Sequence, residues 1–168
     1  QHGDELVRLD AHGQLLPEEH LSLLTEEEQD TYLYDAARAQ QAVADMAAAA
    51  ESDRAVEITN HGGQMGMEAY YGAGEYARTT ARVTFNFGAV NDVDDPRAVD
   101  VEAAEVFNVD DVDWNTIIAA ITEAQQIMAD EGAADTEVNH IIVDARREPL
   151  AVSSKAKVTR MVGRLVSS

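Results

Sequence analysis

Two histidines in comparable contexts are the residues of this chain best suited to chemistry. Thr59-Asn60-His61 and Val138-Asn139-His140 each place an Asn-His pair in a strand-like setting. If the two sheets pair across a pseudo-twofold axis, the imidazoles of His61 and His140 could approach each other and form a metal or acid–base site. No His-x-His pattern and no carboxylate at ligand spacing accompanies them. The competing interpretation is therefore a strand-end histidine that hydrogen-bonds to the backbone.

Other catalytic patterns are absent from the sequence. The chain has no cysteine, which excludes thiol nucleophiles, cysteine metal sites and disulfides. It contains no Gly-x-Ser-x-Gly, Walker or dinucleotide-binding glycine pattern. Acidic runs starting at Asp92 and Asn108 fail the calcium-loop spacing, since Pro96 and Val112 stand where oxygen ligands are needed. We therefore expect no catalytic residue, no metal and no cofactor, and predict that the protein is not an enzyme.

A segment rich in glycine, tyrosine and methionine is the strongest candidate for partner binding. Half of the ten glycines lie in residues 62–74. Tyr and Met side chains give adaptable contact surface, and glycines let loops fit a partner. The competing interpretation is that these side chains form ordinary core on the helix side of a sheet. With the two histidines, the predicted partner-binding residues are Tyr70, Tyr71, Tyr76, Met65, Met67, His61 and His140.

Charge is distributed in four alternating blocks. Residues 1–53 carry a net charge of −11, residues 54–90 carry 0, residues 91–135 carry −12 and residues 136–168 carry +3, for a total of −20. Such a charge repels phosphates, so we expect no nucleic-acid partner. The bases of the last block could neutralise the chain's own acids or meet an acidic surface on a second copy, which leaves a homodimer open: Arg146, Arg147, Lys155, Lys157, Arg160 and Arg164.

The elements that position these residues occur in the same order twice. A capping box at Thr25–Glu28 predicts a long helix over residues 29–50, and strands are expected near 55–59, 65–71 and 79–87. A link at 89–112 includes a short strand or edge segment within 99–107. Asp113 then predicts a helix over 114–130 that ends at Gly132, followed by strands over 137–145, 150–158 and 159–166 and a turn at 146–149.

This order indicates an internal duplication. Ala39 to Asp45 matches Ala124 to Asp130 at five of seven positions, and the charge blocks repeat with the elements. We predict an α+β fold of two tandem helix–βββ units, with antiparallel sheet backed by helices. The expected parts are an N-terminal arm at 1–24, a first unit at 25–90, an acidic link at 91–112 and a second unit at 113–168.

Tandem helix–βββ units over residues 25–88 and 113–166 resemble the architecture of the β-lactamase inhibitory protein family. They are also similar to the PepSY-like domains of exported bacterial proteins. The likeness lies in the element order and in the Ala-Gln-Gln and Asn-His echoes. It implies a concave sheet that grips another protein or a ligand, while helices cover its back. It carries over no binding residue.

These observations predict a non-enzymatic binding or inhibitory module that recognises a protein or ligand through an exposed sheet face and the 62–76 hairpin. Two alternatives stay open: a carrier of a small apolar ligand or lipid with an internal cavity, and a hydrolase-type enzyme with a His61/His140 site. No stretch is long and apolar enough to span a bilayer. Because the chain starts at Gln1, a removed signal peptide or lipid anchor is one interpretation, and we expect an exported protein.

Overall fold

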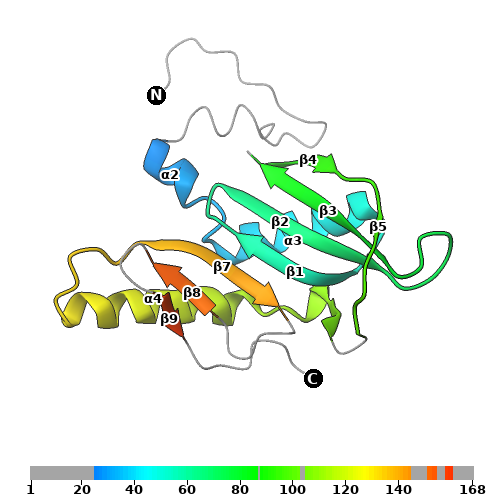
Figure 1. The fold of residues 1–168 in the computed structure, drawn as a ribbon. Helices are drawn as coiled ribbons and strands as arrows, with labels where there is room; N and C mark the ends of the chain where they lie inside the picture. Colours follow the sequence, from blue (N-terminus) through cyan, green and yellow to red (C-terminus); the bar gives the residue numbers. More distant parts are fainter. Residues whose placement is uncertain (1–24, 87, 103–104, 145–150, 155–157, 161–168) are drawn as a thin grey trace, which may run out of the picture.

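The computed structural model describes residues 25–86, 88–102, 105–144, 151–154 and 158–160. They form an α+β fold in which one antiparallel sheet is covered by helices (Figure 1). Two helix-then-strands series follow each other along the chain, as the sequence predicts. The N-terminal arm, the 146–149 turn and five of the six C-terminal bases (all but Arg160) lie outside the described residues, and so do residues 161–166 of the last predicted strand.

The sheet has the strand order β4-β3-β2-β1-β7-β8-β9. The bounds are β1 Arg54–Asn60, β2 Gln64–Tyr71, β3 Thr79–Asn86, β4 Ala89–Val93, β7 Val138–Asp144, β8 Ala151–Ser154 and β9 Val158–Arg160. Two short strands pair off this path: β5 (Arg97–Ala98) with β3, and β6 (Phe107–Asn108) with β1. The pairing of β1 with β7 joins the strands of the first series to those of the second. A single continuous sheet results.

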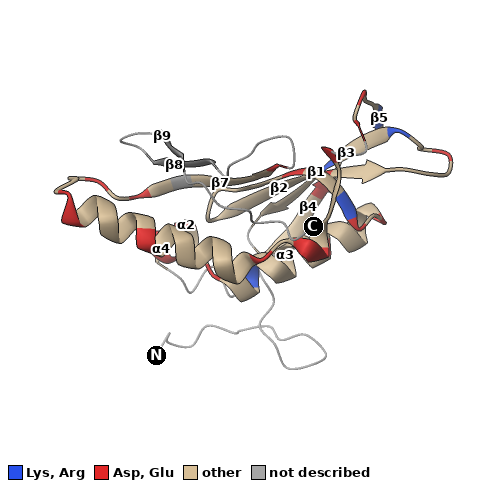
Figure 2. Cartoon of the chain, turned by 90° about the horizontal axis from the view of Figure 1, so that it is seen from below, with Lys and Arg blue, Asp and Glu red and all other residues tan. Residues whose placement is uncertain are grey.

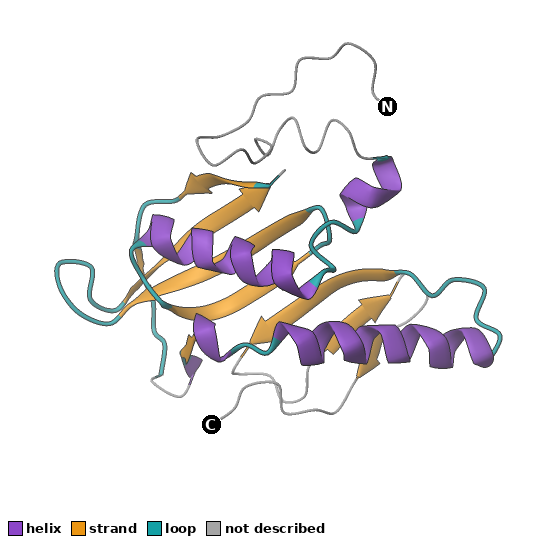
Figure 3. Cartoon of the chain, turned by 180° about the vertical axis from the view of Figure 1, so that it is seen from behind, coloured by secondary structure: helices purple, strands orange, loops and turns teal. Residues whose placement is uncertain are grey.

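The helices α2 (Glu26–Asp30), α3 (Ala36–Ala50) and α4 (Trp114–Asp130) lie on one side of this sheet (Figures 2 and 3). A 3₁₀ turn, η2 (Val109–Asp111), precedes α4. On the other side, the described residues place no helix (Figure 2). We call this side the open face. None of the described helices is long and apolar enough to cross a membrane.

The prediction of one long helix over residues 29–50 is wrong, because residues 31–35 interrupt the helix. Leu33 is fully buried there, and its N–H donates to the carbonyl of Gly62 (2.7 Å). Asp35 then caps α3 by accepting from the backbone N–H of Arg38 (3.0 Å). Burying Leu33 against the sheet therefore outweighs continuing the helix, and a good N-cap residue makes the restart inexpensive.

The acidic link was also predicted incorrectly. Residues 89–93 form strand β4, which pairs with β3 through Val83↔Val93 and Phe85↔Val90. Among the described residues of the predicted 99–107 segment, which exclude 103 and 104, only Phe107 belongs to a strand, where it pairs with Ala55. The second helix, by contrast, begins and ends where predicted: Asp113 accepts from the N–H of Thr116 (3.0 Å), and the helix ends at Asp130.

The core lies between the sheet and the helices. Side chains from both series meet there, including Leu33, Met46, Ile58, Met65, Met67, Val83, Ile117 and Ile141, each fully buried. Strand alternation assigns the intervening residues of β1, β2, β3 and β7 to the open face. The two methionines of the predicted binding segment are thus on the helix side.

Candidate functional site

The two histidines singled out in the sequence meet on the open face. In the β1–β7 ladder Thr59 pairs with Ile142 and Asn60 with Ile141, and one further step brings His61 opposite His140. Their ring centroids are 5.4 Å apart, with the planes tilted by 47°. The predicted approach of the two rings is confirmed. No third His, Cys, Asp or Glu joins them in a metal-ligating group among the described residues.

Arg82 is the cation of this corner, and its side chain lies across the open face. A Cβ built on Gly66 would stand 2.9 Å from Nη2 of Arg82, so the guanidinium covers the one position where β2 carries no side chain. Gly66 pairs with Thr59 on one side and Thr84 on the other. The arginine therefore reaches toward the strand that carries His61. We call His61, His140 and Arg82 the cationic corner.

The surroundings of His61 favour its neutral form. Partial desolvation is the largest cause that lowers the pKa of His61, and the positive charges of His140 and Arg82 lower it further. A group that neutralised these charges would act in the opposite direction. The protonation of this corner is thus sensitive to whatever occupies it.

A polar pocket of about 340 Å³ lies beside the cationic corner. It is lined by Gln29, Asp30, His61, Gly63, Gln64 and Asn86. Gln64 and Asn86 face each other across β2 and β3, and the backbone N–H of His61 donates to the carbonyl of Gln64 (2.8 Å). The pocket therefore offers amide groups as well as an imidazole, with Asp30 as the acid in its lining.

Backbone contacts hold the turn that presents His61. Asn60 is completely buried; its Nδ2 donates to the carbonyl of Leu33 (2.8 Å) and its Oδ1 accepts from the N–H of Gly62 (2.9 Å). Gly62 adopts φ +87°, and a Cβ at this position would lie 1.8 Å from the carbonyl oxygen of Asp30. The turn is thus clamped between β1 and the chain that connects α2 to α3.

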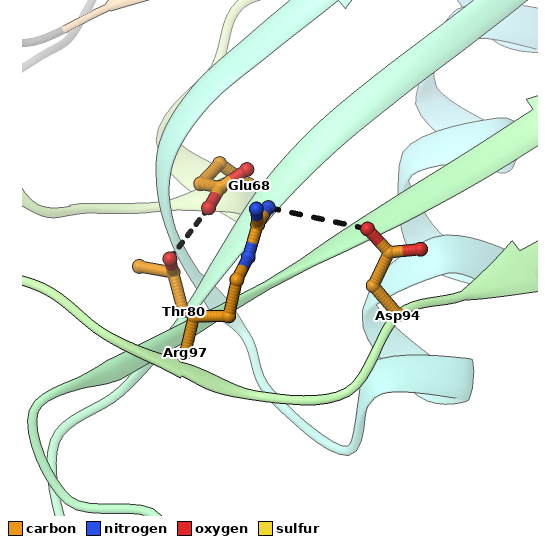
Figure 4. Close-up of polar contacts among 4 residues, drawn as sticks. All are labelled: Glu68, Thr80, Asp94 and Arg97. Carbon is orange, nitrogen blue, oxygen red and sulfur yellow. Dashed lines mark hydrogen bonds and ion pairs between the residues drawn. The ribbon is translucent and has the colours of Figure 1, made fainter.

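A row of carboxylates lies next to the cationic corner. Glu57 pairs with Glu68 on β2 and with Asp144 on β7, which places three acids side by side on the open face. Glu57 accepts from Oγ1 of Thr59 (3.3 Å), and Glu68 accepts from Oγ1 of Thr80. Figure 4 shows the Glu68–Thr80 contact beside the ion pair of Arg97 with Asp94 (4.0 Å). The open face thus carries both signs of charge, and Glu68 lies directly opposite Arg82 in the β2–β3 ladder.

The predicted tyrosines and methionines divide into two groups. Met65 and Met67 are 0% exposed, so they are core residues and cannot contact a partner at the surface. Strand alternation sends every second residue of β2 toward the helices, and the glycine-rich segment is no exception. Tyr76 is 49% exposed. Tyr70 and Tyr71 are half-buried near the end of β2.

Tyr70 and Tyr71 border an open groove at the other end of β1. The groove has a volume of about 560 Å³; its floor is formed by Ala44, Ala47 and Ala48 of α3 and its acids are Glu51, Asp53 and Asp110. The hydroxyl of Tyr71 donates to the carbonyl of Ala50 (2.7 Å), and the guanidinium of Arg54 lies 5.2 Å from the ring of Tyr70. The Tyr71 and Tyr76 rings are 6.1 Å apart.

A small cavity of about 60 Å³ adjoins the groove, with Ala44, Val109 and Asp110 lining both. Trp114 also lines this cavity, and its Nε1 is buried without a hydrogen-bond partner. A buried N–H without an acceptor is unusual because it destabilises the fold, and a water molecule in the cavity could accept its hydrogen bond.

Sequence reasoning missed Arg82 and the groove. Arg82 had a usable signal: Ala81, Val83 and Phe85 were assigned to one face of the strand, which leaves Arg82 on the other face with His61. The groove had none, since its floor is alanine and its edges come from three stretches of the chain, residues 51–54, 70–73 and 109–110.

Comparisons with protein-family models, with curated proteins and with solved structures found no match to this chain. The resemblance to the inhibitory-protein and PepSY-like architectures therefore stays a prediction.

Proposed function

We propose that the protein is a non-enzymatic binding module that recognises a protein partner through the open face of its sheet. The observation that carries this proposal is the cationic corner. His61 and His140 come from strands 79 residues apart in the sequence, and the β1–β7 pairing places them side by side on a face that no described helix covers.

The chemistry of the corner favours binding over catalysis. Two imidazoles and a guanidinium can hold a ligand by charge and hydrogen bonds. A hydrolytic site would pair one imidazole with a nucleophile or with an orienting carboxylate. On the open face, the carboxylates of Glu57 and Glu68 instead accept hydrogen bonds from the hydroxyls of Thr59 and Thr80.

The tyrosine-bordered groove extends the proposed surface at its other end. Tyr76 and the half-buried Tyr70 remain available to a partner, while Met65 and Met67 support the sheet from beneath. An exported location and recognition by a basic C-terminal block remain parts of the prediction that rest on the sequence alone.

Partner capture by variants of opposite faces tests the proposal. The open-face variant combines His61→Asn, His140→Asn and Arg82→Gln; the matched control is Gln126→Ala, an exposed position on α4. Immobilised protein is incubated with an extract of cells that carry it, and bound proteins are quantified by mass spectrometry. We expect one or more species to be retained by the wild type and the control and lost at least about tenfold from the open-face variant.

Equal retention by the open-face variant would contradict the proposal. Circular dichroism and urea unfolding of each variant verify that the fold is intact, since the three substituted side chains lie at the surface or at its edge. Loss from the Gln126→Ala control would instead place the partner on the helices and would equally overturn the proposal.

A further inference from the structure

We propose that the cationic corner is an oxyanion-binding site, which holds a carboxylate or a tetrahedral oxyanion more tightly when its imidazoles are protonated. This inference rests on the proposed function in one respect: the anion would be carried by the partner that binds the open face. The site itself can be probed without that partner.

The donors of the corner converge from three strands. His61 directly follows β1, His140 belongs to β7 and Arg82 belongs to β3. The rings are 5.4 Å apart, and the guanidinium lies over Gly66 of β2, the strand between β3 and β1. Each imidazole offers an N–H, and the guanidinium offers several in one plane. A bound oxyanion could accept from more than one of them at once.

The adjoining pocket supplies room and neutral donors. Its volume of about 340 Å³ exceeds that of a small oxyanion, and the amides of Gln64 and Asn86 lie in its lining. An amide group can donate without adding charge. The pocket opens beside His61, whose side chain is exposed to solvent, so an anion can reach the corner from outside.

The charges that face His61 come from each neighbouring element. Arg82 on β3 and His140 on β7 are the cations. The acids are Asp30 of α2, which lines the pocket, and Glu68 of β2, which lies opposite Arg82 in the β2–β3 ladder. Residues 151–154 of β8 include no ionisable side chain. On β1 itself, Glu57 precedes Thr59 by two residues and accepts a hydrogen bond from its hydroxyl. The corner therefore gains positive charge on protonation, against the net −20 of the whole chain.

The direction of the pH dependence follows from linkage. Desolvation, His140 and Arg82 together lower the pKa of His61 in the free protein. A bound anion offsets the two positive neighbours, so it raises that pKa. By reciprocity, protonation strengthens anion binding, and the affinity rises as the pH falls from about 7.5 to about 5.5. The corner therefore binds an anion more weakly, and releases it more readily, at higher pH.

Histidine NMR on the full chain tests this. The ring resonances are followed by pH titration in chloride, in sulfate and in acetate at matched ionic strength; His61→Asn and His140→Asn assign the two signals among the five histidines. Sulfate keeps its charge over this range, so changes in binding report on the protein. We expect sulfate or acetate to raise the apparent pKa of His61 selectively, relative to chloride.

Two arginine variants provide the control pair. Arg82→Gln should weaken anion binding about tenfold, whereas Arg97→Gln should leave it unchanged, because the guanidinium of Arg97 pairs with Asp94 and that of Arg82 lies over Gly66. A response to sulfate alone identifies a tetrahedral oxyanion, and a response to acetate alone identifies a carboxylate. No selective response to either anion, or equal weakening by both variants, overturns the proposal. Partner capture could still succeed in that case, so the two failures are distinguishable.

Discussion

The two ends of the β1–β2 pair are held by different kinds of contact, main-chain contacts at one end and side-chain contacts at the other. At the histidine end, main-chain groups make the contacts: the carbonyl of Gly62 accepts from Leu33, and the carbonyl of Asp30 occupies the space beside Gly62. At the groove end, side chains make them. A Cβ on Gly72 would lie 1.8 Å from Nη2 of Arg54, but that atom is the tip of a flexible chain.

This difference has a consequence for binding. Backbone contacts restrict the turn at the histidine end to one conformation. The positions of the imidazoles are therefore set before a ligand binds, which reduces the entropy cost of binding. The groove end can rearrange by moving Arg54 or Tyr76. A rigid charged corner and an adaptable aromatic edge on one module fit a partner that is first located by charge and then accommodated by shape.

The largest expected effect contrasts two glycines with equally short clashes. Gly62→Ala meets a backbone carbonyl at φ +87°, so neither the turn nor α2 can yield easily, and we expect the free energy of unfolding to fall by about 4 kcal/mol. Gly72→Ala displaces only a guanidinium and should cost less than about 1 kcal/mol. Urea unfolding monitored by the fluorescence of Trp114, 2% exposed and the sole tryptophan, measures both.

Similar losses from both glycine variants would mean that the two ends are equally stiff, and the distinction would have to be abandoned. The comparison is internally controlled, since each variant adds the same methyl group to a turn that follows or precedes β2.

A smaller contrast concerns polar side chains at the two ends. Asn60→Ala removes both hydrogen bonds of a fully buried amide and leaves the carbonyl of Leu33 and the N–H of Gly62 without that partner, a loss of about 2 to 3 kcal/mol. Ser52→Ala at the groove end removes a part-buried bond to the carbonyl of Tyr70 (2.7 Å) and should cost about 1 kcal/mol.

Chemical denaturation of the two variants provides the measurement. If Ser52→Ala proved the more damaging, the histidine end would not be the better-anchored one. Asn60→Ala should also weaken oxyanion binding at the cationic corner, whereas Ser52→Ala should not, because only the former loosens the turn that carries His61.

The sequence predicted the fold wherever local signals agreed with tertiary contacts. Asp113 and the apolar spacing after it place α4 correctly, since cap and core face favour the same boundaries. The break at Thr31–Asp35 was not predicted, because the alanine-rich sequence that follows favours a continuous helix. A tertiary contact, the burial of Leu33 against the Gly62 turn, interrupts the helix instead. Strand β4 was missed because its acids are typical of a link, whereas Val90 and Val93 pair with β3.

The candidate site was predictable in part for the same reason. The approach of His61 and His140 follows from two matching contexts and the assumption that the two sheets pair, and the β1–β7 ladder joins them. Met65 and Met67 were assigned to a surface by composition, although strand alternation places them in the core. The groove depends on how three separate stretches of the chain pack, and no local pattern encodes that.

The finest contrast between the two ends lies in two tyrosine hydroxyls. Tyr34 packs beside Gly62 at the histidine end and donates to the carbonyl of Val138 (3.1 Å); desolvation, aided by the charge of Glu137, raises its pKa to about 12. Tyr71 donates to the carbonyl of Ala50, and desolvation raises its pKa as well. Either substitution by Phe removes one hydrogen bond, about 1 kcal/mol at neutral pH.

Alkaline titration separates the two hydroxyls. The folded-state pKa of Tyr34 is above its unfolded value, so its contribution to stability is present below about pH 10 and is lost as the pH rises toward about 12. Following tyrosinate absorbance, we expect Tyr34→Phe to remove an ionisation near pH 12 and Tyr71→Phe to leave that ionisation in place. If Tyr34 ionised near pH 10, the ordinary value for tyrosine, the histidine end would admit water readily, and its greater rigidity would be refuted.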